Sequence, residues 1–154
     1  MKRTEASGQP SRGPKPSSST ISWTRPQPTD VIRYVYLWHA EHERGLEDGR
    51  KTRPCLVVST YEQGGGLRVI TAPITTRNYS PAHSVEIPIR VAHHLGLDER
   101  SRIVWNDLNL FTWVGPDVRT GPDGNPFIGI MPERLWRQVI DNIVQARVPA
   151  TPRI

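Results

Sequence analysis

Short runs of aliphatic and β-branched residues fill the middle of the chain, and glycine-rich or polar stretches separate them. Two such runs, 51–59 and 69–76, are joined by Tyr-Glu-Gln-Gly-Gly-Gly, a sequence typical of a turn. This pattern predicts a β-hairpin. Because the start of one strand in an antiparallel hairpin lies beside the end of the other, we expect Arg53 and Thr75 to lie close together at one edge of the sheet.

Further strands are predicted on both sides of this hairpin. In 30–38, apolar residues occupy both alternating sets of positions, which is typical of a strand in a small closed barrel or of one covered on two faces. Residues 83–89 alternate, and Pro88 places that strand at an edge, or ends it, because proline cannot donate to a ladder. The polar stretch 39–50 is predicted to be a long loop. The shorter expected elements are strands at 102–105 and 127–131 and one or two helical turns at 90–95, stopped by Gly96.

The clearest periodicity lies near the C-terminus. Pro132 suits a first helical turn, and Pro149 stops the helix. The spacing of apolar residues predicts one amphipathic stripe between them. Its two rows are Leu135, Val139, Ile143 and Trp136, Ile140, Val144. The whole pattern predicts a mainly β fold, with five to six short antiparallel strands in a small barrel or strongly bent sheet, capped by a C-terminal amphipathic helix.

The chain divides into a tail and one domain. Residues 1–22 are rich in Ser, Pro, Gly and charge and lack apolar periodicity, so we expect a disordered tail there. Residues 23–154 are expected to form a single domain. No apolar run approaches the roughly 18–20 residues that span a bilayer, and no apolar segment follows the basic N-terminus as in a signal peptide. We therefore expect a cytoplasmic protein without a membrane partner.

Charge alone leaves the partner open. The chain carries +5, and its first 22 residues hold four cations against Glu5, which leaves only +2 for the rest. However, six cations gather between residues 44 and 77, against three acids. They form either a solvated face or a patch that follows phosphates. These cations are Arg44, Arg50, Lys51, Arg53, Arg68 and Arg77.

Several kinds of chemistry are disfavoured. Cys55 is the single cysteine and lies in an apolar run, which predicts a buried, inert thiol and excludes an internal disulfide. His39 and His42 have the spacing of metal ligands on a helix, but no third ligand is placed, so solvated loop histidines are favoured. The sequence has no Gly-rich phosphate loop of the P-loop type and no Gly-x-Ser-x-Gly. We expect neither a metal nor a cofactor.

Arg53 and Thr75 remain as the candidate chemistry. The guanidinium of Arg53 has a rigid fork of donors that matches a phosphate, and Pro54 restrains its backbone. Thr75 offers a hydroxyl with restricted rotation. Taken singly, Arg53 suits a surface salt bridge and Thr75 a hydroxyl bound to its own backbone. Together at one sheet edge they suit an anion or phosphate site.

An ordered series of motifs surrounds this pair and resembles the MazF/PemK family of toxins from type II toxin-antitoxin systems. The resemblance covers about residues 29 to 145. The motifs are Asp30-Val-Ile-Arg-Tyr, Arg53-Pro-Cys-Leu-Val-Val, Ala72-Pro-Ile-Thr-Thr, Val85-Glu-Ile-Pro, Ser101-Arg-Ile-Val, and Gly129-x-x-Pro132-x-x-Leu135.

The resemblance implies an SH3-like barrel, usually a homodimer. It implies a metal-independent endoribonuclease that cleaves single-stranded RNA and is neutralised by a cognate antitoxin. The catalytic pair would be Arg53 and Thr75, and the loop 39–50 would lie near the RNA. His39, His42 or His83 could move a proton, and the family motif assigns none of them. The expected RNA-binding residues are Arg50, Lys51, Arg77, Trp38, His39 and His42.

Two other readings stay open. The first is a non-catalytic barrel that binds RNA or a protein partner. The second is growth inhibition by direct action on a protein target such as gyrase. If the protein is a toxin, an acidic segment of the antitoxin that carries aromatic residues is expected to cover Arg53 and the loop 39–50.

Overall fold

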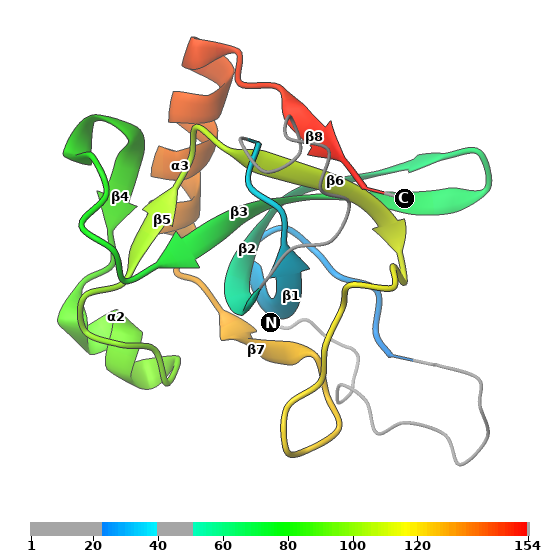
Figure 1. The fold of residues 1–154 in the computed structure, drawn as a ribbon, viewed down its shortest axis with the longest axis horizontal. Coiled ribbons are helices and arrows are strands. Elements are labelled where there is room, and N and C mark those ends of the chain that lie inside the picture. Colours follow the sequence, from blue (N-terminus) through cyan, green and yellow to red (C-terminus); the bar gives the residue numbers. More distant parts are fainter. Residues whose placement is uncertain (1–22, 40–50, 154) are drawn as a thin grey trace.

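The computed structural model describes residues 23–39 and 51–153 (Figure 1). The tail predicted over 1–22 therefore lies outside the described residues, as do the predicted RNA-binding residues His42 and Arg50. None of the helices in the described ranges is long and apolar enough to cross a membrane.

Across these ranges, eight strands form one sheet. The strand order is β4-β5-β3-β2-β1-β7, and β6 pairs with both β3 and β8. The strands are β1 Asp30–Tyr36, β2 Lys51–Gln63, β3 Gly66–Thr75, β4 Ser84–Glu86, β5 Arg102–Val104, β6 Leu108–Trp113, β7 Phe127–Ile130 and β8 Ala150–Pro152. The helices are the 3-10 helix η2 Pro81–His83, α2 Ile89–His94 and α3 Glu133–Ala146.

The mainly β fold with a C-terminal helix is confirmed, but the expected strand count was too low. All these pairings are antiparallel except that of β6 with β8, which is parallel. Neither β6 nor β8 was predicted. Along the described chain β4 and β7 end the path and do not pair with each other, so a closed SH3-like barrel stays a prediction. The edge position predicted for the 83–89 strand is confirmed by β4.

The predicted hairpin is confirmed by β2 and β3, which project well beyond the rest of the sheet (Figure 1). Its two turn residues, Gly64 and Gly65, have φ angles of 64° and 81°. A two-residue turn of this kind needs positive φ at both positions, which glycine adopts without a steric cost. The ladder then runs from the Gln63–Gly66 pair to the Cys55–Pro73 pair.

The core consists of two clusters on opposite faces of the sheet. Val31 and Leu56 belong to the first cluster, whereas Ile32 and Cys55 belong to the second. Successive residues of a strand point to opposite faces, so both alternating sets of β1 are buried. The expectation that this strand is covered on two faces is therefore confirmed.

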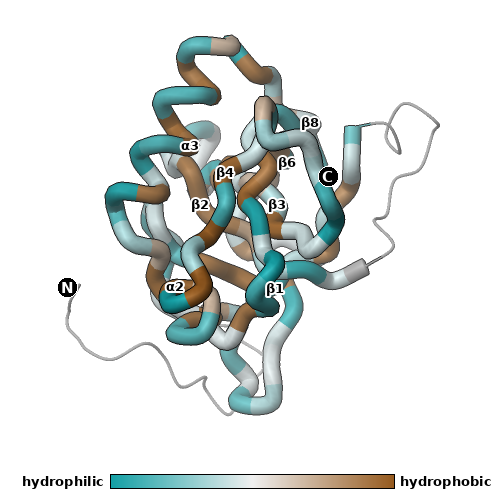
Figure 2. The backbone as a smooth tube through the Cα atoms, turned by 90° about the vertical axis from the view of Figure 1, so that its left-hand side faces the viewer, coloured by the Kyte–Doolittle hydropathy of each residue, from teal (hydrophilic) through white to brown (hydrophobic). Residues whose placement is uncertain are grey.

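The helix α3 covers the first cluster. Leu135 and Val139 are buried, and the indole Nε1 of Trp136 donates to the Val58 carbonyl at 3.1 Å. Figure 2 shows hydrophobic and hydrophilic residues alternating around its turns. The inclusion of Val144 in the buried stripe was wrong, because that side chain is 69% exposed. At about 100° per residue, Val144 lies roughly 180° around the helix axis from Leu135.

Candidate functional site

The structure brings Arg53 and Thr75 to the same end of the hairpin. The last β2–β3 pair at this end is Cys55 with Pro73. Arg53 lies two residues before that cysteine, and Thr75 lies two residues after that proline. Beyond this point β3 leaves β2 and pairs with β5 instead.

Both residues also lie on the same face of the sheet. Arg53 is the cross-strand partner of Tyr34, which belongs to the second cluster. Ile74 belongs to the first cluster, so its neighbour Thr75 faces the side of the second cluster. Arg102 is the partner of Thr75 on β5 and shares that face. One face of this sheet end therefore carries Arg53, Thr75 and Arg102.

The guanidinium of Arg53 lies against a stack of aromatic rings. Its carbon Cζ is 5.3 Å from the centroid of the Trp38 ring. The Trp38 ring stacks on Tyr79, with centroids 6.1 Å apart and planes 18° apart, and it meets Tyr36 edge-on. We call Arg53, Trp38 and Tyr79 the stacking cluster. Trp38 is one of the predicted RNA-binding residues, and its ring contacts the side chains of Arg53, Tyr36 and Tyr79 and helps to orient Arg53.

Two polar residues before β6, Asn106 and Asp107, bind the two tyrosines that contact Trp38. The carboxylate of Asp107 accepts the hydroxyl of Tyr36 at 2.6 Å and the backbone N–H of His39 at 3.2 Å. Burial, together with the negative charge of Asp107, raises the pKa of Tyr36 well above its ordinary value. The other tyrosine, Tyr79, donates its hydroxyl to Asn106 Oδ1 at 3.1 Å. Asn106 and Asp107 thus fix both aromatic residues that flank Trp38.

Thr75 is almost fully buried, with 2% of its surface exposed. Its Oγ1 accepts the backbone N–H of Arg77 at 3.1 Å. From the sequence, Thr75 taken alone was expected to bind nearby backbone with its hydroxyl, and this bond matches that role. It uses the hydroxyl as an acceptor and leaves the hydroxyl proton to be donated. Arg77 itself is exposed and lies two residues after the end of β3.

The two candidate proton carriers that the structure describes, His39 and His83, have different surroundings. His39 lies at the end of the first described segment, and its Nδ1 is 3.3 Å from Thr151 Oγ1. His83 lies against Trp105 instead, with ring centroids 5.6 Å apart. Lys51 begins β2 opposite Tyr36, and the structure describes its backbone only. Of the predicted RNA-binding residues, Trp38 therefore contacts Arg53, and His39 directly follows Trp38 in the chain.

Cys55 is completely buried next to this site. Burial raises the pKa of its thiol far above the ordinary value, and the nearby charge of Arg53 offsets only part of that effect. A thiol in this state is a poor nucleophile. The prediction of a buried cysteine is confirmed.

Sequence reasoning did not assign four residues of this site: Tyr79, Arg102, Asn106 and Asp107. Tyr79 lies in a turn-rich connection, Arg102 is the first residue of the short strand β5, and Asn106 and Asp107 precede β6, which was not predicted. Only the register of β3 with β5 could have placed Arg102 beside Thr75. Across 23–39 and 51–153, no three His, Cys, Asp or Glu side chains gather as they would around a metal ion.

Comparison with models of known protein families gives no match, and no curated protein matches the chain.

Proposed function

We propose that this protein is a metal-independent endoribonuclease that cleaves single-stranded RNA, as the toxin of a type II toxin-antitoxin pair. The observation that carries the proposal is the placement of Arg53 and Thr75 at one end and on one face of the sheet. The stacking cluster supports it, because aromatic rings and arginine guanidinium planes are the groups on which the bases of single-stranded RNA stack.

The proposed reaction needs no bound cofactor. The ribose 2′-oxygen attacks the adjacent phosphorus and forms a P–O bond, while the bond from phosphorus to the 5′-oxygen breaks. The 2′-hydroxyl loses a proton and the departing 5′-oxygen gains one, so the products end in a cyclic phosphate and a 5′-hydroxyl. Negative charge grows on the non-bridging oxygens during this step, and fixed donors aimed at them stabilise the transition state.

Arg53 suits the role of the charge-stabilising donor. Its contact with Trp38 fixes the plane of the guanidinium before substrate binds. Fixed donors need no reorganisation during the reaction, which is the basis of their effect. Arg53 is not the proton acceptor, because a guanidinium keeps its proton at neutral pH. Thr75 would donate its hydroxyl proton to the same phosphate, while Arg77 holds its oxygen.

The resemblance to MazF/PemK toxins supplies the partners in this proposal. They are single-stranded RNA in the cytoplasm, a second copy of the chain, and an antitoxin. An acidic antitoxin segment with aromatic residues would cover the face that carries Arg53 and compete with RNA for it. The charge of Arg53 and the rings beside it complement such a segment.

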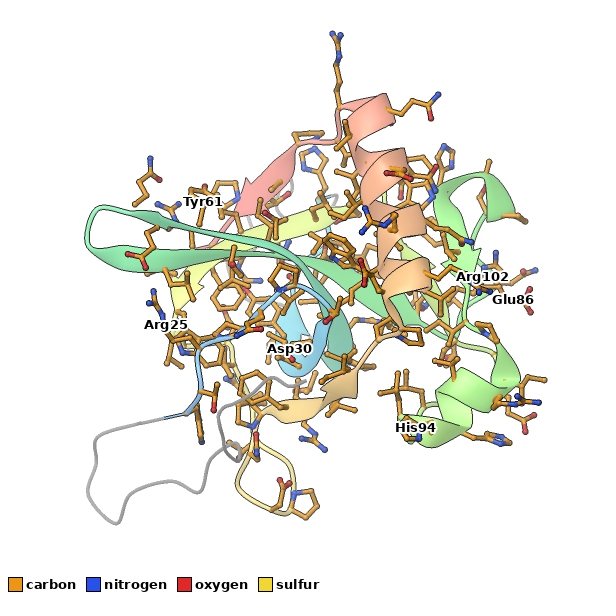
Figure 3. All side chains as sticks on the ribbon, turned by 180° about the vertical axis from the view of Figure 1, so that it is seen from behind. Arg25, Asp30, Tyr61, Glu86, His94 and Arg102 are labelled. Atoms are coloured by element: carbon orange, nitrogen blue, oxygen red, sulfur yellow. The ribbon has the colours of Figure 1, made fainter. Side chains whose placement is uncertain are left out.

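The decisive experiment is RNA cleavage in the presence of EDTA. Wild-type protein, Arg53→Ala and Tyr61→Ala are incubated with a long single-stranded RNA, and the new ends are mapped. Tyr61 is a matched control, because it is exposed on the same strand, eight residues and roughly 26 Å along β2 (Figure 3). We expect cleavage by wild type and Tyr61→Ala, and a loss of about 10²-fold or more in Arg53→Ala. Undiminished cleavage by Arg53→Ala would falsify the proposal.

One observation favours a second candidate, an RNA-binding module without catalysis. The hydroxyl of Thr75 is buried and already bound to the backbone of Arg77. In that case the same protein would bind RNA with an affinity that falls steeply as salt rises, and the RNA would stay intact. The EDTA experiment separates the two candidates, since only the first yields new RNA ends.

A further inference from the structure

Tyr79 is an aromatic residue held in place without belonging to the core. It lies between β3 and η2, four residues after Thr75, and it is half-buried. Neither of the two core clusters includes it. Yet its ring is fixed from two directions, by the stack on Trp38 and by the hydroxyl bond to Asn106. A ring held in this way at the surface is suited to contact a ligand rather than to fill the core.

Trp38 is the common contact of the three planar groups in the stacking cluster. The guanidinium of Arg53 lies over Trp38, and Trp38 lies parallel to Tyr79. Arg53 comes from β2, Trp38 follows β1, and Tyr79 follows β3. A flat ligand that stacks on Tyr79 would therefore bind beside Trp38, the ring that also contacts the proposed phosphate donor Arg53. Nucleobases stack on such rings regardless of sequence, since every base has an aromatic face.

Asn106 adds a group that discriminates between ligands. Its side chain is exposed, and Oδ1 accepts the Tyr79 hydroxyl at 3.1 Å. Among the described residues the Asn106 side chain makes this hydrogen bond alone, so its amide nitrogen keeps two hydrogens to donate. An amide beside a stacking ring can bind the edge of an unpaired base, and that is how single-stranded RNA is read.

We infer that Tyr79 and Asn106 form a nucleobase subsite for the nucleotide next to the cleaved phosphate. Tyr79 stacks on the unpaired base, and Asn106 contacts its edge and sets the base preference. The inference rests on the proposed function, since it takes Arg53 as the group that binds the phosphate. Tyr79 then contributes to the affinity for RNA and Asn106 to the choice of base, so separate measurements can test the two roles.

Two measurements test it. The first is the affinity for a single-stranded RNA with 2′-O-methyl groups, which lacks the attacking hydroxyl and stays intact. We expect Tyr79→Ala to weaken this binding about tenfold or more, and Tyr79→Phe and the control Tyr61→Ala to change it less than twofold. The second is the base preference at the cleavage sites in an RNA with random sequence. We expect Asn106→Ala, and to a lesser degree Tyr79→Phe, to flatten that preference.

The outcomes separate this inference from the proposed function. If wild type binds the methylated RNA through Tyr79 but cleaves no RNA, the subsite stands and the nuclease does not. If wild type cleaves RNA while folded Tyr79→Ala binds the methylated RNA normally, the subsite is overturned. An unchanged base preference in Asn106→Ala overturns the role of that residue. Should Tyr79→Ala fail to fold, Tyr79→Phe and Asn106→Ala still decide the question through the base preference.

Discussion

Thr75 and Arg102 lie directly opposite each other where β3 passes from β2 to β5. Facing residues of neighbouring strands share one side of a sheet, with β-carbons about 5 Å apart. The Nε of Arg102 donates to the buried Ser84 Oγ at 2.8 Å, so the side chain is held in place. Figure 3 shows Arg102 near Glu86, its partner on β4. Thr75 therefore has Arg53 on one side and a second, anchored arginine on the other.

This arrangement predicts that Arg102 binds a second phosphate of the RNA. Arg102→Ala should weaken RNA binding several-fold at low salt. It should also make the plot of log binding constant against log salt concentration less steep by about 0.7, the contribution of one phosphate contact in single-stranded RNA. Arg100→Ala is the matched control, because Arg100 is exposed and its charge is paired with Asp98 at 3.0 Å. Titrations of RNA at several salt concentrations check the prediction, and equal slopes for both variants would contradict it.

A second prediction concerns the shape of Arg53 rather than its charge. Arg53→Lys keeps the charge but loses the planar fork and the contact with the Trp38 ring. We expect single-turnover RNA cleavage to fall by about 10²-fold, while binding of uncleavable RNA falls much less. Rescue of full cleavage by lysine would show that any cation suffices at this position. Measuring rate and affinity on the same preparations separates the two effects.

The sequence was informative where one local pattern determines the element. Two glycines and two aliphatic runs were enough for β2 and β3, and the apolar period was enough for α3. The strand β6 escaped prediction because Asn109 is a buried polar residue inside it, which breaks the apolar alternation. Its amide exchanges hydrogen bonds with the backbone of Leu37, a residue 72 positions away. No local pattern reports such a bond.

The residues of the candidate site divide in the same way, into those that a local pattern predicts and those that only long-range contacts bring together. Arg53 and Thr75 could be paired from the hairpin alone, because adjacent strands place their ends together. Tyr79, Asn106 and Asp107 could not be added, since their contacts join segments that are far apart in the sequence. Tyr79 contacts Trp38 and Asn106, and Asp107 contacts Tyr36. Long-range contacts of this kind depend on the whole topology.

A third prediction concerns the buried ion pair near the C-terminus. Arg153 has only 2% of its side chain exposed and binds Asp117 at 2.7 Å. It also donates to the Val35 carbonyl at 3.2 Å, which ties β8 to β1. Arg153→Ala leaves Asp117 buried without this cation, so we expect a loss of about 3–5 kcal/mol in the free energy of unfolding. Urea denaturation measures it.

The exposed pair of Arg137 with Glu133 provides the comparison for that measurement. Its nitrogen and oxygen are 2.6 Å apart, but both side chains are largely in solvent. Exposed pairs four residues apart on a helix contribute only about 0.3–0.5 kcal/mol. Arg137→Ala should therefore change the unfolding free energy little. Equal effects of both substitutions would show that burial does not govern the Arg153 pair.

The last prediction is a loss of stability at alkaline pH. Burial raises the pKa of Cys55, Tyr34 and Tyr36 in the folded protein above their ordinary values of 9.0 for cysteine and 10.0 for tyrosine. Above about pH 9 the unfolded chain releases these protons while the folded protein keeps them, so the unfolding free energy falls as pH rises. Urea denaturation at pH 8 and pH 10.5 should show this decrease. Tyr36→Phe starts from a lower stability, because it lacks the bond to Asp107, and should show a shallower decrease. If the unfolding free energy of Tyr36→Phe fell as steeply with pH as that of wild type, Tyr36 would not contribute to the alkaline loss of stability.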